Sequence, residues 1–203
     1  IVNSLDAGVD MIIHSVFKDT DGTDNFRQDI AERIGAQGAY VNPTLHVYRA
    51  KTWVVADSRV RRDQIAEYQS DIEKDLREFN TRLEHCSRLI EMGLKVITGS
   101  DSSWGDYRLG NTVYETECLV MAGYSPMQAV LSVTSQAAVA LGIDDVTGTL
   151  ESGKSADIIV VDGNPADNVN DLWNIVDVYF GGCRIDRGSE HSLQSIRQIP
   201  IEL

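Results

Sequence analysis

An aspartate and a histidine each follow a short apolar run, a position where α/β proteins often carry reactive side chains. Asp101 stands just beyond the run 94–97 and Gly99, and His14 ends the run 9–13. Loops at the carboxyl ends of parallel strands converge on one point, so ligand sites gather there. Asp101 would then be a catalytic carboxylate and His14 a site residue. Both have a structural alternative, since an aspartate also caps helices and a histidine at a strand end is commonly buried.

The elements that would position these two residues alternate along the chain. Apolar runs predict strands at 9–14, 39–45 and 94–97, and Pro43 ends the second because proline cannot donate to a ladder. Apolar residues at spacings of three and four predict helices from a cap at Thr23, Asp24 or Asn25 to Gly38, from 56 to 92 as one helix or a broken pair, from 111 to 121, and from Ser125-Pro126 to Gly142. This order of strands and helices is typical of parallel βα units.

Beyond residue 145 the pattern changes to short strands. They are expected at 148–150, 156–162, 175–180 and 183–185, divided by Gly, Asn, Asp and Pro. The pair Gly181-Gly182 between the last two strands is a two-residue hairpin signal. We therefore expect a domain boundary near Asp145, with an α/β part in residues 1–145 and a small β unit in residues 146–203.

The segment 141–165 resembles the C-terminal signature of the amidohydrolase superfamily, in which a short strand, an E-x-G-K-x-A-D turn and an apolar strand lead out of a catalytic barrel. That turn is the segment 151–157 in this chain. Three upstream segments, 7–14, 42–45 and 96–101, are similar in the right order to the sixth, seventh and eighth strands of the imidazolonepropionase-like and Xaa-Pro dipeptidase-like branch. The resemblance implies an α/β fold: the C-terminal part of a (β/α)8 TIM-type barrel, with strands six to eight in residues 1–145, followed by part of a small β-sandwich in residues 146–203.

The resemblance also implies roles for the two strand-end residues. Asp101 corresponds to the eighth-strand carboxylate and His14 to the sixth-strand histidine, so both are expected to be catalytic and to bind metal. The implied cofactor is a divalent cation, zinc in the first place, with one or two ions in a complete site. The implied reaction is the attack of a metal-activated water on a C–N bond of a small amide or of a dipeptide such as Xaa-Pro. Asp101 would pass the proton of that water to the leaving amine, and His14 would bind a second ion or stabilise the oxyanion.

Other parts of the family pattern are missing from the chain. Its four histidines are His14, His46, His85 and His191, none of them in an H-x-H pair, and the residue before His14 is Ile13 where the family usually has Glu. A catalytic zinc site needs three protein ligands, and this chain offers two. We therefore expect a C-terminal fragment of a longer enzyme that lacks strands one to five. The alternatives are a non-catalytic fragment or partner-dependent half barrel, and a metal-free barrel enzyme in which Asp101 is a general acid or base.

Further candidates for substrate contact lie near the strand ends. The segment 46–55 is expected to be a loop or lid after the second strand, and its His46 and Tyr48 could face the barrel mouth. Trp104 could line a pocket, although aromatic residues near strand ends are more often packing. On the long charged helix, His85 is expected to face solvent.

Composition limits the classes of partner. The 203 residues include 42% hydrophobic and 24% charged residues, which is ordinary for a globular protein. The formal net charge of -13 disfavours nucleic acid and anionic membranes, and no apolar run approaches the ~20 residues that span a bilayer. Cys86, Cys118 and Cys183 form no C-x-x-C pair, which favours a reducing compartment such as the cytoplasm over a disulfide framework. A small-molecule substrate is expected, and a homo-oligomer stays open.

Overall fold

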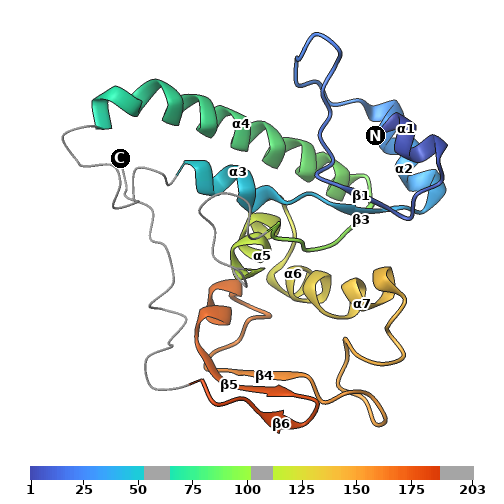
Figure 1. Ribbon diagram of the computed structural model, residues 1–203, viewed down its shortest axis with the longest axis vertical. Helices are drawn as coiled ribbons and strands as arrows, with labels where there is room; N and C mark the ends of the chain where they lie inside the picture. The colour runs from blue at the N-terminus through green and yellow to red at the C-terminus, as the bar shows by residue number, and fades with distance from the viewer. Residues whose placement is uncertain (53–64, 102–111, 188–203) are drawn as a thin grey trace.

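The computed structural model describes residues 1–52, 65–101 and 112–187. Within them the chain forms a parallel sheet with helices around it and, toward the C-terminus, a separate antiparallel sheet (Figure 1). This organisation confirms the α/β class. None of the helices in the described ranges is long and apolar enough to cross a membrane.

The parallel sheet consists of three short strands in the order β1-β2-β3. These are β1 (Met11–Ile13), β2 (Tyr40–Asn42) and β3 (Lys95–Val96), shorter than the apolar runs that predict them. Ile12 pairs with Val41, and Val41 pairs with Val96; all three side chains are buried. β2 is therefore bonded on both sides, while β1 and β3 are the edges of the described sheet.

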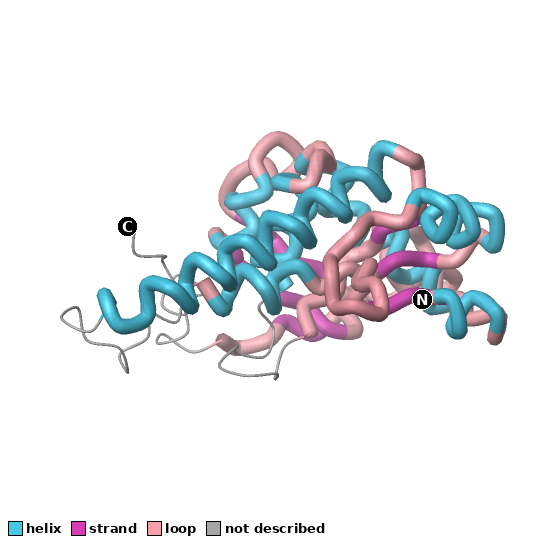
Figure 2. The backbone as a smooth tube through the Cα atoms, turned by 90° about the horizontal axis from the view of Figure 1, so that it is seen from above, coloured by secondary structure: helices cyan, strands magenta, loops and turns pink. Residues whose placement is uncertain are grey.

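Four helices precede or connect these strands: α1 (Val2–Asp6), α2 (Gln28–Gln37), α3 (Leu45–Lys51) and α4 (Ile65–Glu91). α2 ends as expected at Gly38, but it begins after Arg27 rather than at Thr23, Asp24 or Asn25, because that stretch folds back as a bridge between Lys18 and Asp24. Of the stretch 56–92, residues 56–64 lie outside the described ranges, and the described part, α4, is one unbroken helix. It lies along α3 at the top of Figure 1, and Figure 2 shows it extending past the strands.

The prediction of a loop at 46–55 is wrong for its first part, since residues 45–51 form α3. Residues 53–55 lie outside the described ranges. Thr44 begins this helix without a capping bond from its own side chain. The amides of Leu45 and His46 are instead bonded to the carboxylate of Glu115, which lies some 70 residues further along the chain. The helix depends on a distant residue, so the local sequence pattern did not predict it.

The C-terminal helices pack below the strands in Figure 1 and are α5 (Thr112–Met121), α6 (Pro126–Val133) and α7 (Ser135–Leu141). One helix from 125 to 142 was expected, but it breaks at Thr134 (φ -121°, ψ -100°). The amide of Thr98, just beyond β3, donates to the carbonyl of Ser132 at 3.2 Å. In a continuous helix that carbonyl would accept from Gln136, so the strand end replaces a helical bond where the break occurs.

The second sheet is antiparallel in the order β4-β5-β6. It is built from β4 (Ile158–Val161), β5 (Ile175–Phe180) and β6 (Cys183–Arg184), with the short 3-10 helix η3 (Val169–Trp173) before β5. Gly181 and Gly182 both have positive φ, 55° and 80°, which confirms the predicted hairpin. The stretch 148–150 is not a strand. Leu172 and Trp173 in η3 are buried, and η3 packs on α5 and α6.

The capping box at the start of α6 gives a testable prediction about stability. Ser125 accepts from the amide of Gln128 at 3.2 Å, and the Gln128 side chain accepts from the Ser125 amide at 2.8 Å. Ser125→Ala removes the hydroxyl from this capping box, so the free energy of unfolding should fall by about 1 kcal/mol. Urea unfolding followed by circular dichroism measures it. Ser125→Asp keeps a capping side chain and should stay close to wild type; an equal loss in both variants would contradict the capping role.

Candidate functional site

The residues just beyond β1, β2 and β3 share an uncommon backbone conformation. Within the described ranges, the non-glycine residues with positive φ are His14 (70°), Ser15 (37°), Thr44 (51°) and Asp101 (47°). Each follows the carboxyl end of one of the three parallel strands. Such conformations cost free energy and cluster at functional sites. The candidate site is therefore the side of the sheet at which the carboxyl ends of β1, β2 and β3 lie, called the strand-end edge below. It contains both His14 and Asp101.

His14 is held across the ends of β1 and β2. Its amide donates to the carbonyl of Asn42 at 2.8 Å, and its Nδ1 lies 2.8 Å from the hydroxyl oxygen of Thr44. His14 itself is exposed, whereas Thr44 is 2% exposed. A hydrogen bond at one ring nitrogen fixes the orientation of the imidazole. In the neutral ring it also sets whether the other nitrogen carries a proton or a lone pair. Nε2 is the nitrogen left for a ligand.

Asp101 is exposed at the end of the segment that follows β3, and two contacts hold that segment. The hydroxyl groups of Thr98 and Ser132 lie 2.6 Å apart, next to the backbone bond that joins the same two residues. Gly99 lies against the side chain of Asn42, so closely that a Cβ on Gly99 would come within 2.0 Å of the Asn42 amide nitrogen. Glycine at position 99 thus removes side-chain bulk where the chain passes Asn42.

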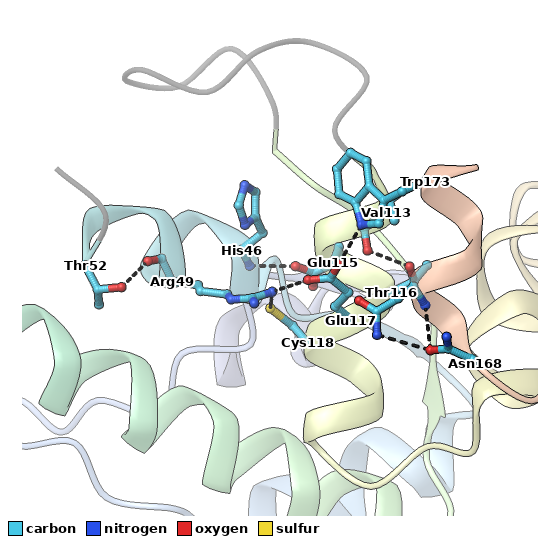
Figure 3. A network of polar contacts seen from close by, with 11 residues as sticks. His46, Arg49, Thr52, Val113, Glu115, Thr116, Glu117, Cys118, Asn168 and Trp173 are labelled. Carbon is cyan, nitrogen blue, oxygen red and sulfur yellow. Dashed lines mark hydrogen bonds and ion pairs between the residues drawn. The ribbon is translucent and has the colours of Figure 1, made fainter. Parts of the chain in front are cut away.

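Behind these strand ends lies a buried polar network between α3, α5 and η3 (Figure 3). The carboxylate of Glu115, fully buried, accepts from the amides of Leu45 at 2.8 Å and His46 at 2.6 Å. Burial raises the pKa of Glu115 to about 7, against the effect of these two amides and of Arg49. A carboxylate at a helix N-terminus satisfies amides that have no partner within the helix.

Glu117, two residues further along α5, serves other partners. It accepts from Arg49 Nη1 and from Trp173 Nε1, each at 2.7 Å. Glu117 therefore ties η3 and α3 to α5, whereas Glu115 serves the start of α3. Sequence reasoning missed both residues. The signal was two glutamates in the ten-residue, otherwise mostly apolar helix 112–121, which contains no Lys or Arg.

The two other histidines in the described ranges, His46 and His85, lie inside the protein. His46 is 1% exposed and stacks on Tyr114 with ring centroids 4.6 Å apart; burial first and Arg49 second lower its pKa to about 3, so it stays neutral. His85 was expected to face solvent, but it is 6% exposed, because Phe17 and Phe26 from the loop after β1 cover this face of α4. Desolvation by burial, and next Arg82, lower the pKa of His85.

The remaining substrate candidates are placed as follows. Tyr48 is half-buried on α3, near the cations Lys51 and Arg82, which lie 4.9 and 5.3 Å from its ring centroid. Trp104 and His191 lie outside the described residues. Among the three residues predicted to contact substrate, Tyr48 is thus the described residue with a partly accessible side chain.

The donor set can be compared with what a metal ion needs. Nowhere in ranges 1–52, 65–101 and 112–187 do three His, Cys, Asp or Glu side chains gather to hold an ion. The strand-end edge offers an imidazole, with Nε2 free of the Thr44 contact, and an exposed carboxylate. Catalytic zinc takes three protein ligands. His14 and Asp101 therefore fit as part of such a site, which would need further ligands from outside the described residues.

Comparisons with known proteins agree on one family. The model described as "Amidohydrolase family" matches residues 3–185. The chain is 35% identical over 74 residues to an imidazolonepropionase from Thermoplasma volcanium (36% of this chain, 18% of that protein), and 32% identical over 85 residues to one from Symbiobacterium thermophilum (40% and 20%).

Solved structures give the same result. A Xaa-Pro dipeptidase with bound methionine in its active site matches with a TM-score of 0.70 and 25% identity, over 91% of this chain and 42% of that one. A. niger ochratoxinase matches with a TM-score of 0.63 and 20% identity, over 90% of this chain and 38% of that one. This match shows a shared fold. The chain thus spans less than half the length of each of these proteins.

Substitution of Gly99 tests the contact with Asn42. In Gly99→Ala the new Cβ would overlap the Asn42 side chain, so the free energy of unfolding should fall by about 1–3 kcal/mol. Gly35→Ala is the matched control: it lies inside α2, and its Cβ would meet Leu94 at an ordinary 3.9 Å. The control should gain about 0.5–1 kcal/mol from the better helix propensity of alanine. Chemical denaturation of both variants measures this, and a neutral Gly99→Ala would show that the contact is not restrictive.

The buried carboxylate of Glu115 predicts a pH dependence of stability. Its pKa is raised from 4.5 to about 7 in the folded state, so the stability that it contributes is complete below about pH 4.5 and is lost as pH rises through 7. Across this window the free energy of unfolding of wild type should fall by about 3 kcal/mol relative to Glu115→Gln.

Urea titrations at a series of pH values measure that difference. Arg49, Cys86 and Cys118 also interact with Glu115, and they are the same in wild type and in Glu115→Gln. Glu117→Gln is the control, because it removes a neighbouring carboxylate and keeps Glu115, and it should follow the wild-type pH dependence. Parallel curves for wild type and Glu115→Gln would contradict the raised pKa.

Proposed function

The chain belongs to the amidohydrolase family, and on that premise we propose that it is the C-terminal part of a metal-dependent hydrolase that cleaves a C–N (amide) bond. In this proposal β1, β2 and β3 are the sixth, seventh and eighth strands of a (β/α)8 barrel in residues 1–145, and residues 146–203 form part of a small β-sandwich. One observation supports it most: the left-handed residues after all three parallel strands lie at one sheet edge and include His14 and Asp101.

The proposed site would hold one or two divalent cations, zinc in the first place, through His14, Asp101 and ligands from outside this chain. When bound, such a cation would lower the pKa of a coordinated water and so supply the nucleophile at neutral pH. The Asp101 carboxylate would accept the proton that the nucleophile loses and deliver it to the leaving nitrogen. Its exposure at the strand end suits a group that must reach both.

Two roles are open to His14, and the bond to Thr44 separates them. If Nδ1–H donates to the Thr44 oxygen, Nε2 carries a lone pair and would bind a cation. If the Thr44 hydroxyl donates to Nδ1, Nε2–H would donate to the substrate carbonyl and stabilise the oxyanion. The direction of one hydrogen bond thus decides whether His14 acts as a ligand or as a donor.

The proposed substrate is a small amide or a dipeptide. The names of the relatives, imidazolonepropionase and Xaa-Pro dipeptidase, support this class. Contacts with the substrate are proposed for Tyr48 and Trp104; the third candidate, His46, is 1% exposed and stacks on Tyr114, so it is left out of the proposed contacts. His46 and Tyr48 lie on α3, which begins directly after β2 and so starts at the same sheet edge. A cytoplasmic location and a homo-oligomer remain parts of the proposal that rest on the sequence alone.

The alternative is a non-catalytic fragment or a half barrel that depends on a partner. The edge positions of β1 and β3 in the described sheet favour it, because an unpaired strand edge invites association. Sedimentation of the purified 203-residue chain separates the two, since a stable folded monomer would argue against a partner-dependent half barrel.

Asp101→Asn tests the catalytic assignment in the complete protein. The amide is similar in size but accepts no proton, so the turnover number should fall by a factor of about 10²–10⁴ while the fold is retained. Amide and dipeptide hydrolysis gives the rate, circular dichroism gives the fold, and elemental analysis of the purified variant gives its metal content, which should fall too. Rates near those of wild type would rule out the role assigned to Asp101.

A further inference from the structure

The start of α3 departs from the usual way of capping a helix. A threonine before the first turn normally turns its own hydroxyl to the amides of that turn. Thr44 occupies this position with φ 51° and ψ 45°, and its side chain makes no capping bond. Its hydroxyl oxygen lies instead 2.8 Å from Nδ1 of His14, on the neighbouring strand end. The hydroxyl that would cap the helix therefore contacts the candidate site residue.

Glu115 does the capping in its place. Its two carboxylate oxygens take one amide each, from Leu45 at 2.8 Å and from His46 at 2.6 Å. The side chain is fully buried and reaches α3 from α5, so it serves the helix without entering the strand-end edge. Because Glu115 takes the first two amides and the amide of Val47 donates to the Thr44 carbonyl at 3.3 Å, these three amides make no demand on the Thr44 hydroxyl.

We propose that Glu115 is a positioning residue for His14: by capping α3 it leaves the Thr44 hydroxyl free to accept from Nδ1–H, which aims Nε2, with its lone pair, at the site. The inference rests on the proposed function for its catalytic meaning and deepens it by choosing the ligand role of His14. Without Glu115, two amides of α3 would lack an acceptor, and the Thr44 hydroxyl would turn to them and leave Nδ1.

The chain contains a matched control for this proposal. Glu117 is also buried on α5 and also accepts two hydrogen bonds, from Arg49 and Trp173, whereas the first two amides of α3 are bonded to Glu115. A purely structural role predicts that removal of either carboxylate loosens the region alike. The positioning role predicts that only Glu115 affects the imidazole of His14.

The test is the tautomer of His14, read from the imidazole ¹⁵N shifts of the complete protein after treatment with a chelator. Spectra are taken near pH 9, about two units above the pKa of about 7 to which burial raises Glu115, so that its carboxylate is ionised. The His14 signals are assigned by their loss in His14→Gln. In wild type the Nδ1–H form should dominate.

The variants then divide in a defined way. Glu115→Gln and Thr44→Val should both lose the Nδ1–H form as the major state, while Thr44→Ser, which keeps the hydroxyl, and Glu117→Gln should retain it. In the Thr44→Val background Glu115→Gln should add no further shift, because both act through one hydroxyl. If Glu115→Gln does not fold, Glu115→Asp takes its place, since its shorter side chain cannot hold both amides, and the same shift is expected.

Three results would overturn the inference: a dominant Nε2–H form in wild type, an unchanged tautomer in the Glu115 variant, or the same shift in Glu117→Gln. Turnover of amide and dipeptide substrates is measured on the same samples. A tautomer that shifts as expected in a protein that hydrolyses neither substrate would leave the positioning of His14 standing and refute the proposed function. Hydrolysis by wild type with an unchanged tautomer in Glu115→Gln would do the reverse.

Discussion

The pairing of β2 with both of its neighbours is the constraint on which the strand-end edge depends. The carbonyls of Val41 and Asn42 accept the amides of Ile97 and His14, so the residues that follow β1 and β3 are fixed relative to one central strand. Neighbouring parallel strands lie about 4.8 Å apart, which puts the two outer strand ends roughly 10 Å from each other.

Around this edge the exposed polar side chains are distinct from the buried ones that support them. His14 and Asp101 are exposed, whereas the residues that hold their segments, Thr44, Ser132 and Glu115, are buried. Supporting groups in a dry environment keep a single arrangement, because an unmade hydrogen bond there costs more than in water. The cost is visible in Glu115, whose ionised form is disfavoured by burial and is nevertheless bonded at both oxygens.

The sequence predicted the features that depend on neighbouring residues, and it did not predict those that depend on contacts between distant residues. The end of α2 at Gly38, the cap at Ser125 and the Gly181-Gly182 hairpin each depend on local backbone chemistry, and the structure confirms them. The same holds for the strand ends that carry His14 and Asp101. α3, the break at Thr134 and the burial of His85 depend on Glu115, Thr98 and Phe17, which no local pattern connects to them. Catalytic roles and metal ligands came from the resemblance to a known family rather than from local patterns.

The distance along the chain between α3 and its cap bears on how the protein is made. Glu115 follows Leu45 by 70 residues, so a ribosome adding about 5–20 residues per second synthesises it roughly 4–14 s later. During this interval the first turn of α3 has no carboxylate to accept its amides. A helix of seven residues is unstable without tertiary contacts, so α3 is not expected to form on its own while it waits for Glu115. Docking of α5 supplies the long-range cap, so the start of α3 can take its final form only after residue 115 has been synthesised.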